Sequence, residues 1–122
     1  MTYEDFCEST DVSNHQLQFY LDGMNEENGE INGVLKRVRR GDYGELPKNY
    51  IKEEGLEYII ENYRDIKMDI LKEIGDRQWY STRFLQKINS SWKEVEIINV
   101  DKLKERIKSD KILGRGEDVN DR

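Results

Sequence analysis

The sequence predicts a mainly helical α+β domain, with four to five helices and a small two-stranded ribbon in a winged-helix-like arrangement. Apolar residues recur at helical spacing in several segments, loops rich in Asn and Gly separate them, and two short β-branched segments suit strands. At 122 residues the chain has the length of one domain. We expect residues 1–114 to form a single compact domain and residues 115–122 a flexible tail.

The first helix is expected over residues 3–9 and the second over 12–24. Ser13 suits the N-cap of the second helix, and Gln16 lies three residues later as in a capping box. Asn and Gly residues predict a loop over 25–33, because both residue types favour turns. The other expected elements are a strand over 34–38, a loop over 41–47, helices over 52–74 and 77–88, a strand over 93–100, and a last helix that begins at Asp101 and ends at Gly114.

Every fourth residue between positions 53 and 73 is acidic, and we call these residues the acidic row. Its members are Glu53, Glu57, Glu61, Asp65, Asp69 and Glu73. On one continuous helix each like-charged pair of neighbours costs roughly 0.2–0.5 kcal/mol. The row is therefore either a solvated helix face or a surface that binds a basic partner, with carboxylates in the role of nucleic-acid phosphates.

Charge is unevenly distributed along a chain whose net charge is −6. Residues 1–35 contain eight acidic residues and no Lys or Arg, whereas residues 36–52 are mainly basic. Such asymmetry affects which partners the protein attracts and how fast it associates with them, but it does not determine the fold.

Residues 3–22 carry a helix-turn-helix pattern. Its positions are Phe6, Cys7, Thr10, Val12, Ser13, Leu17 and Tyr20. The pattern resembles the helix-turn-helix of the MerR and excisionase type, although Asp11 stands where that family has a turn glycine. The resemblance implies a recognition helix from Ser13 that reads DNA, with a basic wing on the DNA backbone. The residues so implied are Asn14, His15 and Gln18 on the helix, and Lys36, Arg37, Arg39 and Arg40 on the wing.

Motifs for catalysis or cofactor binding are not recognised in the sequence. The one histidine, His15, has no adjacent nucleophile motif, and with Cys7 it falls short of a zinc site. We expect no catalytic residue, no metal and no cofactor. A single cysteine fits a reducing cytoplasm, and no segment has the length of a membrane span.

The leading hypothesis is a small non-catalytic binding protein that occupies the basic surface of a nucleic-acid-handling or other basic partner protein. A phage or mobile-element inhibitor, of anti-CRISPR or other anti-defence type, would act in this way. The alternative is a winged helix-turn-helix transcriptional regulator of a mobile element that binds DNA. A homodimer is compatible with either hypothesis.

Overall fold

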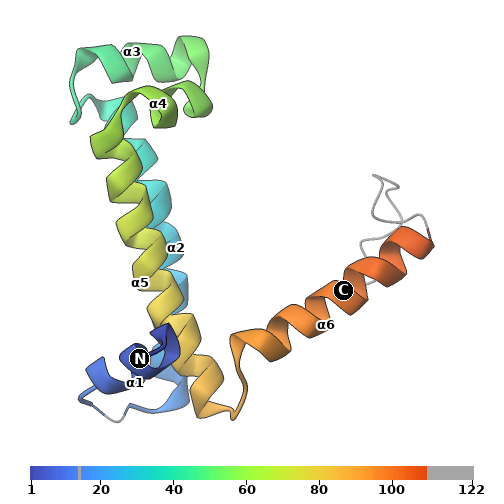
Figure 1. Ribbon diagram of the computed structural model, residues 1–122. Helices are drawn as coiled ribbons and strands as arrows, with labels where there is room; N and C mark the ends of the chain where they lie inside the picture. Colours follow the sequence, from blue (N-terminus) through green and yellow to red (C-terminus); the bar gives the residue numbers. More distant parts are fainter. Residues whose placement is uncertain (14, 110–122) are drawn as a thin grey trace. The chain divides into compact units, whose positions relative to one another are not determined.

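The computed structural model describes residues 1–13 and 15–109, and all the regular structure in these residues is helical (Figure 1). The helices are α1 (Tyr3–Thr10), α2 (Leu17–Arg40), α3 (Glu45–Glu54), α4 (Leu56–Asn62), α5 (Arg64–Lys87) and α6 (Trp92–Lys108). The chain divides into two compact units, residues 1–84 and 85–122. None of the described helices is long and apolar enough to cross a membrane.

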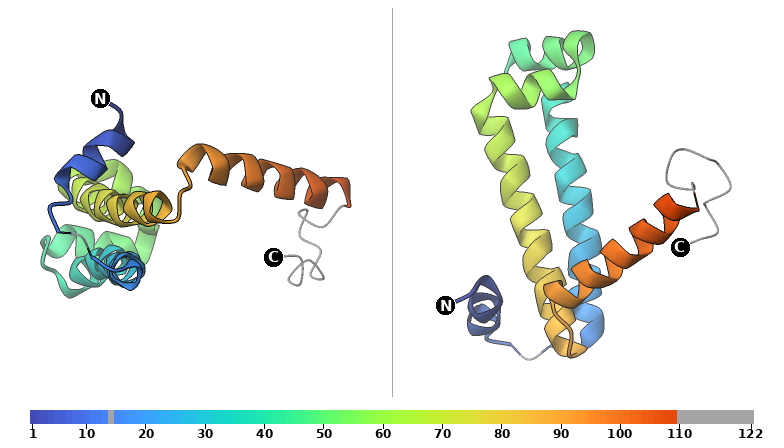
Figure 2. Two further views of the ribbon diagram at one scale, coloured as in Figure 1. Left: turned by 90° about the horizontal axis from the view of Figure 1, so that it is seen from below. Right: turned by 45° about the vertical axis from the view of Figure 1, so that its right-hand side comes forward.

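Two helices of 24 residues each, α2 and α5, run antiparallel and side by side in the first unit (Figures 1 and 2). The short helices α3 and α4 lie across the end of this hairpin where α2 ends and α5 begins. The buried core at that end is formed by Val34, Val38, Ile59 and Ile66, and half-buried tyrosines pack around it. The Tyr43 hydroxyl also donates a hydrogen bond to Asp69 Oδ2 at 2.5 Å.

Local sequence signals account for several helix ends. Thr2 and Asp5 form a capping box that begins α1. Gly41 adopts a left-handed conformation, with φ of 92°, and ends α2. Ser91 Oγ accepts a hydrogen bond from the backbone N–H of Glu94 and begins α6 in the second unit.

The expected α+β fold is wrong, because no strand occurs among the described residues. The segment 34–38, expected as a strand, forms the end of α2, so the winged-helix ribbon is absent there. The segment 93–100, expected as the second strand, lies within α6. Its β-branched residues favour a strand only where a partner strand is available, and the Ser91 cap favours a helix.

The expected loop over 25–33 is also wrong, since these residues continue α2. Asn and Gly lower helix propensity, but packing along a neighbouring helix overrides such a preference. The expected helix over 52–74 is divided at Gly55, with φ of 90°, and again at Tyr63, which is extended. Gly75, expected as its end, lies inside α5, so the expected helix over 77–88 is the continuation of that helix.

Two expectations fall partly on residues outside the described ranges. The tail over 115–122 and the end of the last helix at Gly114 both lie there. The last helix begins at Trp92 and not after Asp101 as expected. The single compact domain over 1–114 stays a prediction.

The close approach of α2 to α5 predicts that Gly23 tolerates no side chain. A methyl group added at Gly23 would overlap the Tyr80 ring carbons Cδ1, Cε1 and Cγ. We expect Gly23→Ala to be less stable by about 1–3 kcal/mol than the matched variant Gly75→Ala. Nothing lies within 4 Å of the added atom at Gly75, which is also inside a helix. Urea unfolding measures both variants, and equal stability would contradict the packing described.

Candidate metal centre

Three carboxyl groups converge between α2 and α5, and we call them the carboxylate cluster. Glu27 comes from α2, and Glu73 and Asp76 come from α5. One carboxylate oxygen from each lies within 4.8 Å of the others. Glu73 and Asp76 are three residues apart, so they share a face of their helix. The antiparallel packing brings that face to Glu27.

The environment of Glu27 disfavours its negative charge. Its Oε2 atom is buried and has no hydrogen-bond partner in the described part of the chain. Burial, hydrogen bonding with Glu73 and the charges of Asp76, Glu73 and Glu30 together raise the pKa of Glu27 to about 7. A carboxyl group in this position therefore keeps its proton at a higher pH than an exposed glutamate does.

Cationic side chains do little to offset these charges. Lys72 is near, but its described ion pair is with Asp69, at 4.0 Å. No ion pair among the described residues involves Glu27, Glu73 or Asp76. Carboxylate oxygens are the ligands that Mg²⁺ and Mn²⁺ prefer, whereas Zn²⁺ favours nitrogen and sulfur. Metal sites in helical bundles likewise combine carboxylates from facing helices with a pair of ligands three residues apart on one helix, although that pair is a Glu and a His.

Aromatic side chains lie beside the carboxylate cluster. The pKa of Tyr80 is raised by burial and then by the charges of Glu27, Glu26 and Asp76, so its phenol is close to the carboxylates. The rings of Tyr80 and Phe19 are 5.9 Å apart, and Phe19 stacks on His15 at 3.7 Å. Phe19 remains 39% exposed. An apolar, partly open surface therefore adjoins the candidate metal ligands.

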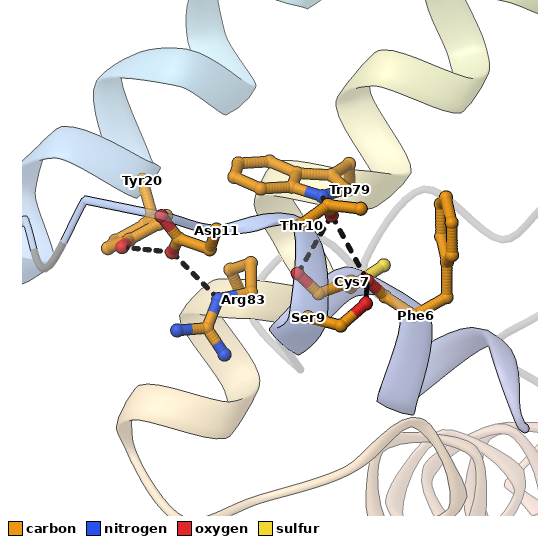
Figure 3. A network of polar contacts seen from close by, with 8 residues as sticks. All are labelled: Phe6, Cys7, Ser9, Thr10, Asp11, Tyr20, Trp79 and Arg83. Atoms are coloured by element: carbon orange, nitrogen blue, oxygen red, sulfur yellow. Dashed lines mark hydrogen bonds and ion pairs between the residues drawn. The ribbon is translucent and has the colours of Figure 1, made fainter.

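A polar network holds the N-terminal segment against the hairpin (Figure 3). The Tyr20 hydroxyl and Arg83 Nε both donate to Asp11 Oδ2, at 2.5 and 2.8 Å. Trp79 Nε1 donates to Thr10 Oγ1 at 2.9 Å. Burial would raise the pKa of Asp11, but the hydrogen bonds from Tyr20 and Arg83 and the charge of Arg83 outweigh it and lower that pKa. The network fixes α1 and the start of α2 on α5, close to the aromatic rings.

The structure separates most members of the acidic row. Glu53 is on α3, Glu57 and Glu61 are on α4, and Asp65, Asp69 and Glu73 are on α5. The first four are exposed, whereas Asp69 is half-buried under the Tyr43 hydroxyl. Only Glu73 belongs to the carboxylate cluster, so the row is not one continuous helical stripe.

The residues of the implied DNA-binding surface are also not brought together. His15 stacks on Phe19, Gln18 donates to Asp22 Oδ1, and Asn14 lies outside the described residues. The second helix begins at Leu17 and not at Ser13. The basic residues Lys36, Arg37, Arg39 and Arg40 are in the last turns of the same helix. At 1.5 Å per residue they lie about 30 Å from Gln18 along its axis, so they cannot flank it as a wing.

Sequence reasoning missed Glu27 and Asp76. Glu27 fell in a segment interpreted as a loop, and Asp76 lay beyond the expected helix end at Gly75. The available signal was a pair of acidic residues three apart in each segment, Glu27 with Glu30 and Glu73 with Asp76. That signal has meaning only when both segments are helical.

Comparison of the chain with protein family models, curated proteins and solved structures found no match. A functional assignment therefore rests on the geometry of the site.

The raised pKa of Glu27 predicts an unusual pH dependence of stability. A carboxyl whose pKa is higher in the folded state stabilises the fold at low pH, and this contribution falls as pH rises from its unfolded value of 4.5 to about 7. We expect the midpoint of thermal unfolding to fall between about pH 5 and 7.5, and Glu27→Gln to reduce that fall. An unchanged pH profile in the variant would show that Glu27 titrates normally.

Proposed function

We propose that the protein is a divalent-cation-dependent hydrolase that cleaves a phosphate ester or anhydride, with nucleotides as its substrate class. The observation that carries the proposal is the convergence of Glu27, Glu73 and Asp76, with one buried oxygen of Glu27 lacking a partner. The non-catalytic character expected from the sequence is the competing hypothesis.

Metal chemistry favours a phosphate-bearing substrate at this site. Mg²⁺ held by a few carboxylates keeps several water ligands and commonly binds substrate phosphates in their place. Such a cation offsets the repulsion between the carboxylates and an anionic substrate, and it lowers the pKa of a bound water. Asp76 is exposed and the other two residues are half-buried, which leaves the site accessible to a substrate.

The proposed reaction needs water alone as its co-reactant. The water oxygen attacks phosphorus, the bond from phosphorus to the leaving phosphate or alcohol oxygen breaks, and the water proton passes to a carboxylate.

The adjacent aromatic rings support a nucleotide as the substrate. Phe19 is partly exposed, and its ring packs against the ring of Tyr80. The pKa of Tyr80 is in turn raised by the charges of Glu27 and Asp76 in the carboxylate cluster. A base stacked on an aromatic face gains binding energy with little sequence preference. A nucleotide can therefore place its phosphates at the cation and its base on the aromatic surface.

The proposal predicts that removal of one cluster carboxylate abolishes both cation binding and hydrolysis. Glu73→Gln and Asp76→Asn keep the side-chain size and remove the charge. We expect each to lower nucleotide hydrolysis by about 100-fold or more, because a catalytic cation contributes several kcal/mol. The assay uses a panel of nucleoside mono-, di- and triphosphates with Mg²⁺ or Mn²⁺, and it detects released phosphate and pyrophosphate.

Mn²⁺ binding, measured by electron paramagnetic resonance, provides a readout that is independent of substrate choice. Glu53→Gln is the matched control, because Glu53 is exposed on α3 and should leave both readouts unchanged. Absence of saturable Mn²⁺ binding by the unmodified protein would overturn the proposal. Mn²⁺ binding without hydrolysis of any nucleotide would overturn the proposed hydrolase activity and leave only the cation site.

The acidic row supports a second candidate function, binding to a basic partner protein. Glu53, Glu57 and Glu61 are exposed, and no ion pair in the described part of the chain involves them. Exposed charge of one sign accelerates association with a surface of the opposite sign. An inhibitor from a phage or mobile element is one protein that would use such a surface.

This second candidate predicts that neutralising exposed row members removes partner binding and leaves the carboxylate cluster intact. The variant Glu53→Gln, Glu57→Gln, Glu61→Gln, Asp65→Asn should keep the thermal stability of the unmodified chain, because none of these residues is buried. Capture of the same basic proteins by variant and unmodified chain in a pull-down would contradict a role for the row.

A further inference from the structure

Three basic side chains line a hollow where the end of α2 meets α3, and we call it the basic hollow. Arg39 comes from the last turn of α2, and Lys48 and Lys52 come from α3, where they are one helical turn apart. Asn49 and Ile51 complete the lining. The hollow has a volume of about 460 Å³, and sites for small molecules commonly enclose about 300–1,000 Å³. It is therefore large enough to receive a small ligand.

The turn that ends α2 places the three basic side chains together. Gly41 is left-handed, and after it the chain continues into α3 across the end of the hairpin (Figure 1). A Cβ atom added at Gly41 would lie 3.2 Å from Lys48 Cδ and 4.0 Å from its Nζ. The side chain of Lys48 thus lies beside the end of α2, two residues beyond Arg39. The hollow is built within the first unit from two helices that follow one another in the chain.

The basic side chains of the hollow are not neutralised by acidic ones. No ion pair in the described part of the chain involves Arg39, Lys48 or Lys52, and all three are exposed. Glu45 also approaches Gly41, since its Oε1 would lie 3.9 Å from the same added Cβ atom. One acid against three bases leaves an excess of positive charge. Like charges repel, so an anion in the hollow lowers the electrostatic energy of this arrangement.

Stabilisation of helix ends accounts for some of these charges but not for the hollow. Cations near the last turn of a helix interact favourably with its dipole, and Arg39 and Lys52 are in the last turns of α2 and α3. That effect needs only positive charge near each helix end. It does not require basic side chains from both helices to line one concave surface together with an amide and an apolar side chain.

Phosphate groups are the anions that suit the basic hollow. The Arg39 guanidinium can hold phosphate oxygens through paired N–H donors, and Lys48 and Lys52 supply compact point charges. Three cations match the charge of two or more linked phosphates better than that of a single one. The volume of the hollow also exceeds the space that one phosphate ion fills.

The surroundings of the hollow favour a compact ligand over an extended nucleic acid. Glu53 and Glu54 directly follow Lys52, and both are exposed. Glu57 and Glu61 are exposed on α4, which packs next to α3. A nucleic-acid strand that left the hollow in this direction would meet carboxylates, which repel its phosphates. A short chain of phosphates stays among the basic side chains.

We propose that the basic hollow binds a small molecule that carries a chain of two or more phosphates, either an inorganic polyphosphate or a nucleoside polyphosphate. Arg39 and Glu27 are twelve residues apart on α2, which is about 18 Å along the helix axis. The hollow is therefore separate from the carboxylate cluster. The inference does not depend on the cation-dependent hydrolysis.

The test is isothermal titration calorimetry of the full chain with inorganic tripolyphosphate and, separately, with a nucleoside triphosphate. Both titrations contain EDTA, which removes the divalent cations that the carboxylate cluster would need. We expect saturable binding of one ligand per chain that weakens as salt rises, because salt screens exposed charges. Equal affinities identify the phosphate chain alone as the recognised group, and tighter binding of the nucleoside triphosphate identifies a nucleotide as its source.

The triple variant Arg39→Gln, Lys48→Gln, Lys52→Gln should weaken binding by about 100-fold or more, because it removes every charged hydrogen bond to the phosphates. Thermal unfolding verifies that the variant is folded, which we expect because all three residues are exposed.

Arg40→Gln is the matched control, because it removes the same charge from the next residue of α2. Arg40 does not line the hollow, and its Nε donates to Asp42 Oδ1 at 3.0 Å. This variant should change the affinity by less than about threefold. No binding of either ligand, or an equal loss in the triple variant and the control, would overturn the proposal. Tighter binding of a single-stranded oligonucleotide than of tripolyphosphate would overturn the choice of a compact ligand.

Discussion

Packing of α2 along α5 is the interaction on which the rest of the first unit depends. At one end it is fixed by the apolar core around Val34 and Ile66, and at the other by the approach of Gly23 to Tyr80. The Asp11 network then holds α1 on the same end. Because both ends are fixed, the middle of the hairpin has no freedom to move apart. Glu27 must therefore face Glu73 and Asp76 although their charges repel.

This arrangement brings the three carboxylates of the candidate site together at the expense of stability. Repulsion between converging carboxylates lowers the free energy of unfolding at neutral pH, and the raised pKa of Glu27 reflects this repulsion. Strain of this kind is common where a protein is organised to bind something. A divalent cation relieves the repulsion directly, and the proposed hydrolysis uses the same cation to polarise a phosphate. Stability and activity are then linked through one ligand.

The two sides of the hairpin have contrasting chemistry. One carries apolar side chains such as Met24 of α2 and Ile74 of α5, and the other carries the carboxylates of Glu26, Glu30 and Asp76. The acidic row contributes only Glu73 to the carboxylate cluster, and its first three members are on α3 and α4.

The sequence by itself determined the helical periodicity of residues 3–9 and 12–24 and the tail beyond the last apolar anchor as expectations, and local chemistry is enough for such features. The helical periodicity agrees with α1 and with the start of α2, although the second expected helix was too short. Only the tertiary structure decided that residues 25–33 are helical, because helix propensity there is weak and packing of α2 along α5 prevails. The candidate site depends on the same packing of α2 along α5. Glu27 and Asp76 become neighbours only when two distant helices pack together, and no local pattern contains that information.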